Sequence, residues 1–236
     1  MAFDITVITG NWALFAQGAA VTLLVAATSV VVAFALAVPL ALMALSRRQL
    51  LRWSAAVYLE CFRNLPFIVI LYIFFYGLPM LQLQLPEIAT GIIALSCFAS
   101  AYLSEIVRGA ILSVPAGQME AARAIGMSYI RGMWEIVAPQ TLKFLIPPCT
   151  NTSISMLKET SVLSAITVGE ITYQGLIVQG RTFAPFEVFL TTACLYWLMT
   201  SAFAALMGRA ERSNNTTRSA PQTRRSLADQ FLKIEA

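Results

Sequence analysis

The chain has 236 residues, of which 58% are hydrophobic and 12% are charged, and its formal net charge is +4. A soluble domain carries about 25% charged residues, so this composition excludes an ordinary soluble protein and indicates several membrane spans. The chain contains no histidine, which excludes histidine acid–base chemistry and most metal sites. Its four cysteines lie in hydrophobic segments without metal-type spacing, and we expect no disulfide framework and no cofactor.

The first predicted membrane span covers residues 18–45, an apolar run long enough to cross about 30 Å of hydrocarbon with tilt. This run is much longer than the ~7–15 apolar residues of a signal peptide, so we do not expect cleavage. Arg47, Arg48 and Arg52 follow the run. A basic cluster next to a span marks the cytoplasmic side.

The second predicted span covers residues 58–78 and is expected to stop at Pro79. Glu60 and Arg63 lie three residues apart near its start, so they share one face of a helix and can pair. One interpretation is a salt bridge at the cytoplasmic boundary. The alternative is a role for this pair in the translocation path.

Three further spans are predicted at residues 88–107, 143–166 and 186–207. Glu105 and Arg108 are again three residues apart, at the cytoplasmic end of the first of these spans. Residues 143–166 are too polar for a simple hydropathy search to find. We still assign a span there, because the chain must recross the membrane if its basic residues are to stay on one side.

The segment at residues 116–139 cannot cross a bilayer. It carries Glu120, Arg123, Arg131 and Glu135, and charges of this kind cost about 2.5–3.5 kcal/mol each at a helix centre in lipid. The segment must therefore lie in water or at an interface, between the third and fourth spans.

This segment is predicted to form a helix, a bend at Gly126, and a second helix that ends at Pro139. Glycine costs a helix about 1 kcal/mol relative to alanine and accepts the dihedral angles of a bend. Ala121, Ala122 and Ala124 are small, so the surface of another protein could approach this backbone closely. The pattern is what a docking element requires.

The same segment resembles a known loop. Its residue types and spacing are similar to the "EAA" loop of bacterial ABC-importer permease subunits, a cytoplasmic loop that fits a groove of the ATPase subunit. The matching residues are Glu120, Ala121, Ala122, Gly126, Ile136 and Pro139. The family usually has leucine before the proline, where this chain has Ala138. An ordinary amphipathic loop between two spans is the alternative.

A polar stripe is predicted on the fourth span. Residues three and four apart share a helix face, and this spacing joins Asn151, Thr152, Ser155, Lys158 and Glu159. The two charges lie roughly 22–24 Å along the helix from Lys143 at ~1.5 Å per residue, which is deep in the hydrocarbon. Ionisable residues there suggest a solute pathway. The alternative is an ion pair that only joins helices, although neighbouring residues point about 100° apart and pair poorly with each other.

The run Lys158-Glu159-Thr160-Ser161 resembles the Lys-Asp-Thr-Ser run of polar amino-acid permeases, with glutamate in place of aspartate. Phe62-Arg63-Asn64-Leu65-Pro66 and the Gly18-x-x-x-Thr22-Leu23 pattern are also similar to that family, so the resemblance extends from about Gly18 to Met207. From the two charges at membrane depth we hypothesise that Lys158 and Glu159 bind the solute, with Asn151, Thr152, Ser155 and Arg63 as lesser candidates.

The resemblance implies an all-α, five-span permease of the bacterial inner membrane that pairs with a second copy or a close paralogue. Two ATPase subunits would dock at the cytoplasmic loops, and an extracytoplasmic binding protein would deliver the solute. The solute would be a polar amino acid such as histidine, glutamate, glutamine or arginine, or an opine. Lipid would surround the spans, and no nucleic acid partner is implied.

Basic residues orient the five spans. With the N-terminus outside and the C-terminus in the cytoplasm, the inner segments receive Arg47, Arg48, Arg52, Arg123, Arg131 and six basic residues of the tail, eleven in all, and the outer segments hold only Arg181. This is a strong positive-inside bias. We therefore expect a permease domain at residues 1–208 and a basic cytoplasmic tail at residues 209–236, which we expect to be largely disordered.

The sequence has no GxxxxGK[ST] phosphate loop, so we expect ATP hydrolysis on a separate subunit and no enzymatic activity here. Transport would then proceed by alternating access between two helix packings. A passive channel or a scaffold subunit could share the five-span layout and is the alternative. An intramembrane enzyme is disfavoured, because histidine, GxSxG and paired-aspartate motifs are absent.

Overall fold

The computed structural model describes residues 3–215, and every regular element in this range is helical. The elements in chain order are α1 (Ile5–Gly10), α2 (Trp12–Ala44), α3 (Gln49–Arg63), α4 (Phe67–Met80), α5 (Glu87–Leu112), α6 (Ala116–Ala124), α7 (Tyr129–Gly132), the π-helical turn η1 (Met133–Val137), α8 (Ala138–Glu159), the 3₁₀-helix η2 (Thr160–Ile166), α9 (Ile171–Thr182) and α10 (Pro185–Asn215). The all-α class expected from the sequence is confirmed.

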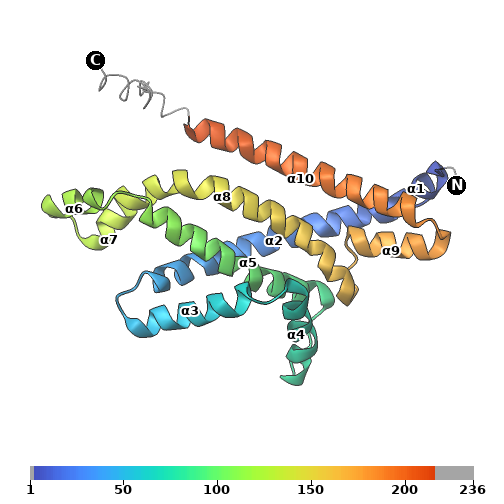
Figure 1. Ribbon diagram of the computed structural model, residues 1–236, viewed down its shortest axis with the longest axis horizontal. Coiled ribbons are helices and arrows are strands. Elements are labelled where there is room, and N and C mark those ends of the chain that lie inside the picture. The colour runs from blue at the N-terminus through green and yellow to red at the C-terminus, as the bar shows by residue number, and fades with distance from the viewer. Residues whose placement is uncertain (1–2, 216–236) are drawn as a thin grey trace, which may run out of the picture.

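The four longest helices, α2, α5, α8 and α10, run lengthwise through the molecule (Figure 1). The short helices α6 and α7 lie at one end of this bundle, and α1 and α9 lie at the other. The helix α4 points away from the long axis. Taken singly, α2, α5 and the first 25 residues of α10 are long and apolar enough to cross a membrane. The number rises to five if each of two bent helix pairs counts as one span.

Small residues allow α2 and α5 to pack closely, and this is the most extensive helix contact in the bundle. The buried face of α2 repeats every three or four residues and consists of Phe15, Gly18, Thr22, Val25, Ala26, Ser29, Ala33, Ala37 and Ala41. The Ser96 hydroxyl of α5 lies 3.3 Å from the Ser29 carbonyl oxygen and 2.6 Å from that of Ile92. Close approach of backbones through small residues is the usual way in which membrane helices associate.

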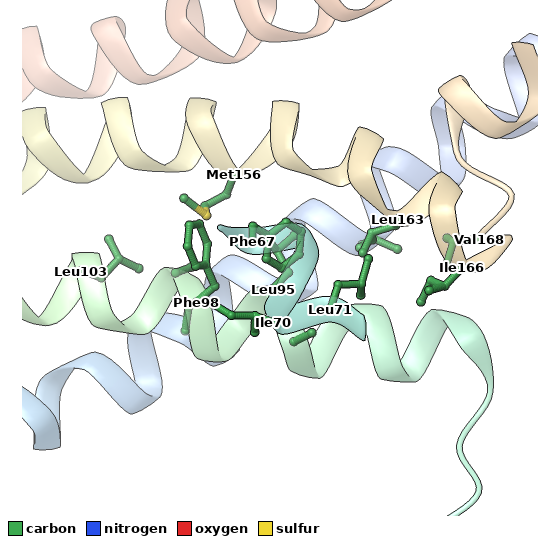
Figure 2. Close-up of a cluster of buried hydrophobic side chains, with 14 of the residues drawn as sticks. Phe67, Ile70, Leu71, Leu95, Phe98, Leu103, Met156, Leu163, Ile166 and Val168 are labelled. Atoms are coloured by element: carbon green, nitrogen blue, oxygen red, sulfur yellow. The ribbon is translucent and has the colours of Figure 1, made fainter. Parts of the chain in front are cut away.

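The main hydrophobic cluster joins α5 to α4, α8 and η2. Figure 2 shows Phe67 and Leu71 of α4 directed toward Leu95 and Phe98 of α5, with Met156 of α8 beside them. Leu71 and Leu95 are fully buried. The cluster fixes the first turns of α4 and the far end of α8 against the α2–α5 pair.

The second predicted span is not one helix. α3 and α4 meet at an angle of 105° instead of forming a continuous helix through residues 58–78. The break lies at Asn64-Leu65-Pro66, where Pro66 has an extended backbone (φ −59°, ψ 139°) and precedes α4 as its cap. Proline removes a helical hydrogen bond and disfavours helix in the residue before it. Pro79, expected to stop the span, lies within α4.

Basic residues that the orientation count assigns to opposite sides of the membrane lie at opposite ends of the helix bundle. The α2–α3 junction, α6, α7 and the end of α10 lie at one end of the bundle, whereas α9 runs toward the other (Figure 1). Arg47, Arg48 and Arg123 therefore lie at the first end, and Arg181 lies near the second. Helix α10 continues into the predicted tail as far as Asn215, and the rest of the tail, 216–236, lies outside the described residues.

The closest approach between backbones lies where α2 crosses the start of α9. A Cβ atom added at Gly18 would lie 2.9 Å from the Cα of Ile171 and 3.0 Å from its nitrogen. One turn further along α2, the Thr22 hydroxyl oxygen accepts a hydrogen bond from the Ile171 N–H at 3.2 Å. Only glycine fits at residue 18 without moving α9.

Substitution Gly18→Ala should lower the free energy of unfolding by about 1–3 kcal/mol, because the new methyl group meets backbone that cannot turn aside. Thermal denaturation of the purified protein measures this change. Gly109→Ala is the matched control, because Gly109 lies within α5 with no atom within 4 Å of the added Cβ. The control should be as stable as the wild type or more stable. Equal denaturation temperatures for Gly18→Ala and the wild type would contradict the close approach.

Candidate functional site

The predicted docking loop folds as a helix, a bend and a helix. Helix α6 ends at Ala124, and Gly126 follows with φ at +86°, a conformation that glycine adopts without strain. The N–H groups of Gly126 and Met127 donate to the carbonyl oxygens of Arg123 and Ala122 at 3.0 and 3.1 Å, which closes the end of α6. The bend predicted at Gly126 is therefore present.

The loop presents one packed face and one exposed face. Ala122 is 4% exposed, and its Cβ lies 3.6 Å from the position of a Cβ added at Gly132, so small residues bring α6 and the end of α7 together. Glu120, Ala121 and Pro139 are exposed, and Ile136 is half-buried. Four large apolar side chains are also exposed, namely Ile125, Tyr129, Ile130 and Trp134. An element that exposes this much apolar surface beside charges is typical of a protein interface.

The second helix of the loop does not end at Pro139, as the sequence suggested. Helix α7 continues through the π-helical turn η1 directly into α8, and Pro139 lies in the first turn of α8. Pro139 removes one backbone hydrogen bond from this continuous path, directly after the π-helical turn. Two side chains add hydrogen bonds to carbonyl oxygens one turn back: Gln140 Nε2 donates to Ile136 O, and Thr141 Oγ1 donates to Val137 O, both at 2.9 Å.

Helix α8 carries the predicted polar stripe on its outer face. Asn151, Ser155 and Lys158 are exposed, at spacings of four and three residues, and Thr152 and Glu159 beside them are half-buried. Met156 and Leu157 turn the other way, where each is 4% exposed. The helix is continuous from Ala138 to Glu159 even though it contains Pro147 and Pro148. The five predicted residues therefore share one side of α8.

The two charges of the stripe interact electrostatically with each other as neighbours, without forming an ion pair. Lys158 and Glu159 make no ion pair and no side-chain hydrogen bond among residues 3–215. An ion pair within this chain that only joins helices is therefore not supported there. Two surface pockets of the single chain lie elsewhere, one along α4 and the start of α5 and one between α2, α8 and α10.

The predicted pair of Glu60 and Arg63 does not form. Asn64 Nδ2 donates to the Glu60 carboxylate, and Arg63 instead lies 4.0 Å from Glu105 and over the Tyr102 ring on α5. Both residues lie in α3, and each has another partner: Asn64 for Glu60, and Glu105 with Tyr102 for Arg63. The second predicted pair is confirmed: Arg108 Nε and Nη2 donate to the two Glu105 oxygens at 3.0 and 2.8 Å. Arg63 thus contacts α5, and none of its ion pairs, hydrogen bonds or ring contacts among the described residues reaches the α8 stripe.

Sequence reasoning missed a buried carboxylate, Glu170, which is 0% exposed. It precedes α9 and accepts hydrogen bonds from the Thr172 and Tyr173 N–H groups at 2.9 and 2.8 Å, and from the Tyr196 hydroxyl of α10 at 2.6 Å. The sequence signal that could have identified Glu170 is a carboxylate in the N-cap position of a predicted helix, ahead of a further apolar run. Glu170 joins the bend between η2 and α9 to α10.

Comparison with known proteins adds independent observations. Residues 33–215 match a family described as binding-protein-dependent transport system inner membrane component. The probable glutamine ABC transporter permease protein GlnM of Bacillus subtilis is 32% identical over 197 residues, which is 84% of this chain and 91% of that protein. The octopine transport system permease protein OccM of Rhizobium meliloti is 36% identical over 243 aligned positions, covering 98% of each chain.

A solved structure is also similar. The crystal structure of an amino acid ABC transporter with histidines contains a chain that is 32% identical to this one and superposes with a TM-score of 0.84. The match covers 90% of this chain and 100% of that chain. The fold as a whole is therefore that of a known transporter architecture.

Substitution Tyr196→Phe should lower the free energy of unfolding by about 1.5–3 kcal/mol, because it removes a donor to a buried carboxylate. Tyr173→Phe is the matched control: its hydroxyl makes no hydrogen bond among the described residues, and only its backbone N–H contacts Glu170. Thermal denaturation in the same detergent compares the two. A denaturation temperature equally lowered in both variants, or in neither, would contradict the role assigned to the Tyr196 hydroxyl.

Proposed function

The chain belongs to the family of binding-protein-dependent transport system inner membrane components, which are ABC-importer permeases, and from this premise we propose that it moves a polar amino acid into the cytoplasm by alternating access. The observation that carries the proposal is the exposed loop formed by α6, Gly126 and α7, with its EAA residues in place. The loop lies at the end of the bundle where the described basic residues gather (Figure 1).

The loop is the docking site for a separate ATPase subunit. Glu120 and the apolar side chains of Ile125, Tyr129 and Trp134 supply charge and apolar surface to the partner. Charge complementarity gives such an interface specificity, and desolvated aromatic residues give it strength. Because the sequence has no phosphate loop of its own, ATP is bound and hydrolysed by that partner. The complex contains two ATPase subunits and two permease chains, either identical or paralogous.

Continuity of the helix transmits the movement of the ATPase to the membrane. α7, η1 and α8 form one uninterrupted helical path from Tyr129 to Glu159. A displacement of the loop therefore tilts or shifts α8 as a body, which carries the polar stripe with it. Small residues between α2 and α5 keep the rest of the bundle rigid, so the motion is a switch between two packings of α8.

The solute binds at the α8 stripe. An amino acid presents a carboxylate and an ammonium group, and these complement the ammonium of Lys158 and the carboxylate of Glu159. Both groups form no ion pair and no side-chain hydrogen bond in the described chain and lie on an open face. The second permease chain closes this face and completes the cavity, with Asn151, Thr152 and Ser155 as polar contacts. Arg63, which contacts Glu105 on α5, takes no direct part.

A polar amino acid or opine is the proposed class of solute because the relatives share it. Proteins at least 32% identical over four fifths of this chain or more carry names that specify glutamine, L-cystine and octopine transport. An extracytoplasmic binding protein selects the solute and delivers it at the α9 end of the bundle. Localisation in a bacterial inner membrane follows from the same family.

Substitution Glu120→Lys should reduce ATP-driven amino-acid uptake roughly tenfold or more, because reversing a charge at an interface costs several kcal/mol. The variant should still reach the membrane, and the ATPase subunit should no longer co-purify with it. Gly126→Asp should have the same effect through a side chain at positive φ. Gln118→Lys adds the same charge to the other face of α6 and should retain uptake. Wild-type uptake in Glu120→Lys vesicles would remove the docking assignment.

Substitutions Lys158→Met and Glu159→Gln should each raise the solute concentration for half-maximal uptake about ten- to a hundredfold, since each removes a charged hydrogen-bond partner. Transport assays in vesicles with a saturating binding protein measure this concentration. Lys143→Met is the matched control on the same helix, exposed but close to the docking loop. Unchanged uptake affinity in both Lys158→Met and Glu159→Gln would refute the solute site.

A further inference from the structure

Helix α3 exposes an apolar face that nothing in the described part of the chain covers. Leu50, Trp53 and Val57 are 79, 61 and 55% exposed. Their spacing of three and four residues places them on one side of the helix. The other side packs into the bundle through Ala55 and Leu59, which are 0 and 8% exposed. Helix α3 therefore has apolar residues on two sides. One side packs into the bundle, and the exposed side needs a partner.

Three arginines lie around the first turn of α3, with Arg47 and Arg48 just before the helix and Arg52 on the side opposite Leu50. Arg47, Arg48 and Arg52 are exposed, and their side chains make no ion pair and no hydrogen bond within residues 3–215. Residues 46–59 contain no aspartate or glutamate that could neutralise them. The positive charge of this segment is thus available to a partner outside the chain.

The arginines and the exposed apolar face of α3 follow one another along the expected membrane normal. The arginines lie at the α2–α3 junction, at the end of the bundle that carries α6 and α7, and α3 runs from there toward the middle of the bundle (Figure 1). Arginine side chains at this depth reach lipid phosphates, tryptophan favours the interface, and apolar residues beyond them meet acyl chains. Along α3, arginines are followed by tryptophan and apolar residues, just as the phosphate of a phospholipid is followed by the interfacial region and the acyl chains.

We propose that the start of α3 binds anionic phospholipid of the inner leaflet through Arg47, Arg48 and Arg52 around its first turn and the exposed apolar face of Leu50, Trp53 and Val57. The orientation rests on the proposed function, which makes the α6–α7 end cytoplasmic. Anionic lipids there attract juxtamembrane arginines, roughly fivefold in affinity for each residue. The phosphate and acidic headgroup pair with the arginines, and the acyl chain lies along Leu50 and Val57.

Other occupants fit this surface less well. A second copy of the chain packed about a two-fold axis would bring the arginine clusters of both copies toward each other, which costs free energy. A soluble partner could neutralise the arginines, but it could not follow the apolar face into the membrane, because α3 leads directly into the apolar helix α4. An anionic lipid satisfies both the charge and the apolar surface.

Quenching of Trp53 fluorescence by brominated lipids tests the proposal. The full-length chain is placed in phosphatidylcholine nanodiscs with a minor fraction of brominated phosphatidylglycerol or, for comparison, of brominated phosphatidylcholine. Subtracting the signal of Trp53→Phe isolates Trp53 from the other three tryptophans. We expect stronger quenching by the anionic lipid, and weaker selectivity as salt increases.

The triple variant R47Q/R48Q/R52Q should lose this selectivity, with an affinity for phosphatidylglycerol lower by on the order of a hundredfold. R47K/R48K/R52K keeps the charge and should retain most of it. Arg181→Gln, at the other end of the bundle, should behave as the wild type. Equal quenching by both lipids, or no quenching by either because protein covers Trp53, would overturn the proposal.

ATP-driven uptake in vesicles of phosphatidylcholine alone separates this proposal from the proposed function. Uptake that depends on Glu120 supports the importer whatever the fluorescence result. Selective quenching in a chain that shows no Glu120-dependent uptake would instead support the lipid site and count against the importer.

Discussion

The close packing of α2 against α5 is the constraint on which the other elements depend. Hydrocarbon offers no hydrogen bonds, so a broken helix in a membrane must satisfy its free backbone groups within the protein. This bundle contains two such breaks, between α3 and α4 and between η2 and α9. Both breaks lie against the α2–α5 pair. At the first break the Tyr102 hydroxyl of α5 donates to the Arg63 carbonyl oxygen at 3.5 Å, and at the second the Thr22 hydroxyl of α2 accepts from the Ile171 N–H.

The rigid pair also divides the remaining helices by role. Met156 and Leu157 of α8 pack into the core, whereas the opposite side of α8 is exposed. Only one face of α8 is therefore packed against the rest of the chain. It is also the helix that continues directly into the docking loop. Because α8 packs on one side only and continues into the α6–α7 loop, a displacement of that loop can move α8 as a rigid body between two packings. The fixed and the moving parts of the proposed transporter thus follow from where small residues and polar residues fall in the sequence.

Sequence patterns predicted those structural features that depend only on the residues of one short segment. The docking loop, its bend at Gly126 and the α8 stripe could be located because charge, glycine and helical spacing are visible in single segments. The break at Pro66 was missed although proline was present, because apolar composition alone favoured one span through residues 58–78. The course through Pro139 was missed because a π-helical turn and two side-chain hydrogen bonds stabilise it. Glu170 was missed because its burial depends on Tyr196, 26 residues away.

The charges of α8 that form no ion pair are the reason why the proposed transporter includes a second permease chain. A charge at membrane depth is costly unless water, a ligand or another protein chain meets it. Lys158 and Glu159 form no ion pair and no side-chain hydrogen bond among the described residues, and the stripe lies on an open face instead of in a pocket. Facing a second chain, the same stripe would line an enclosed polar cavity whose ion partners arrive with the solute. In that arrangement, the absence of a resident ion-pair partner is what leaves Lys158 and Glu159 free to bind an amino acid.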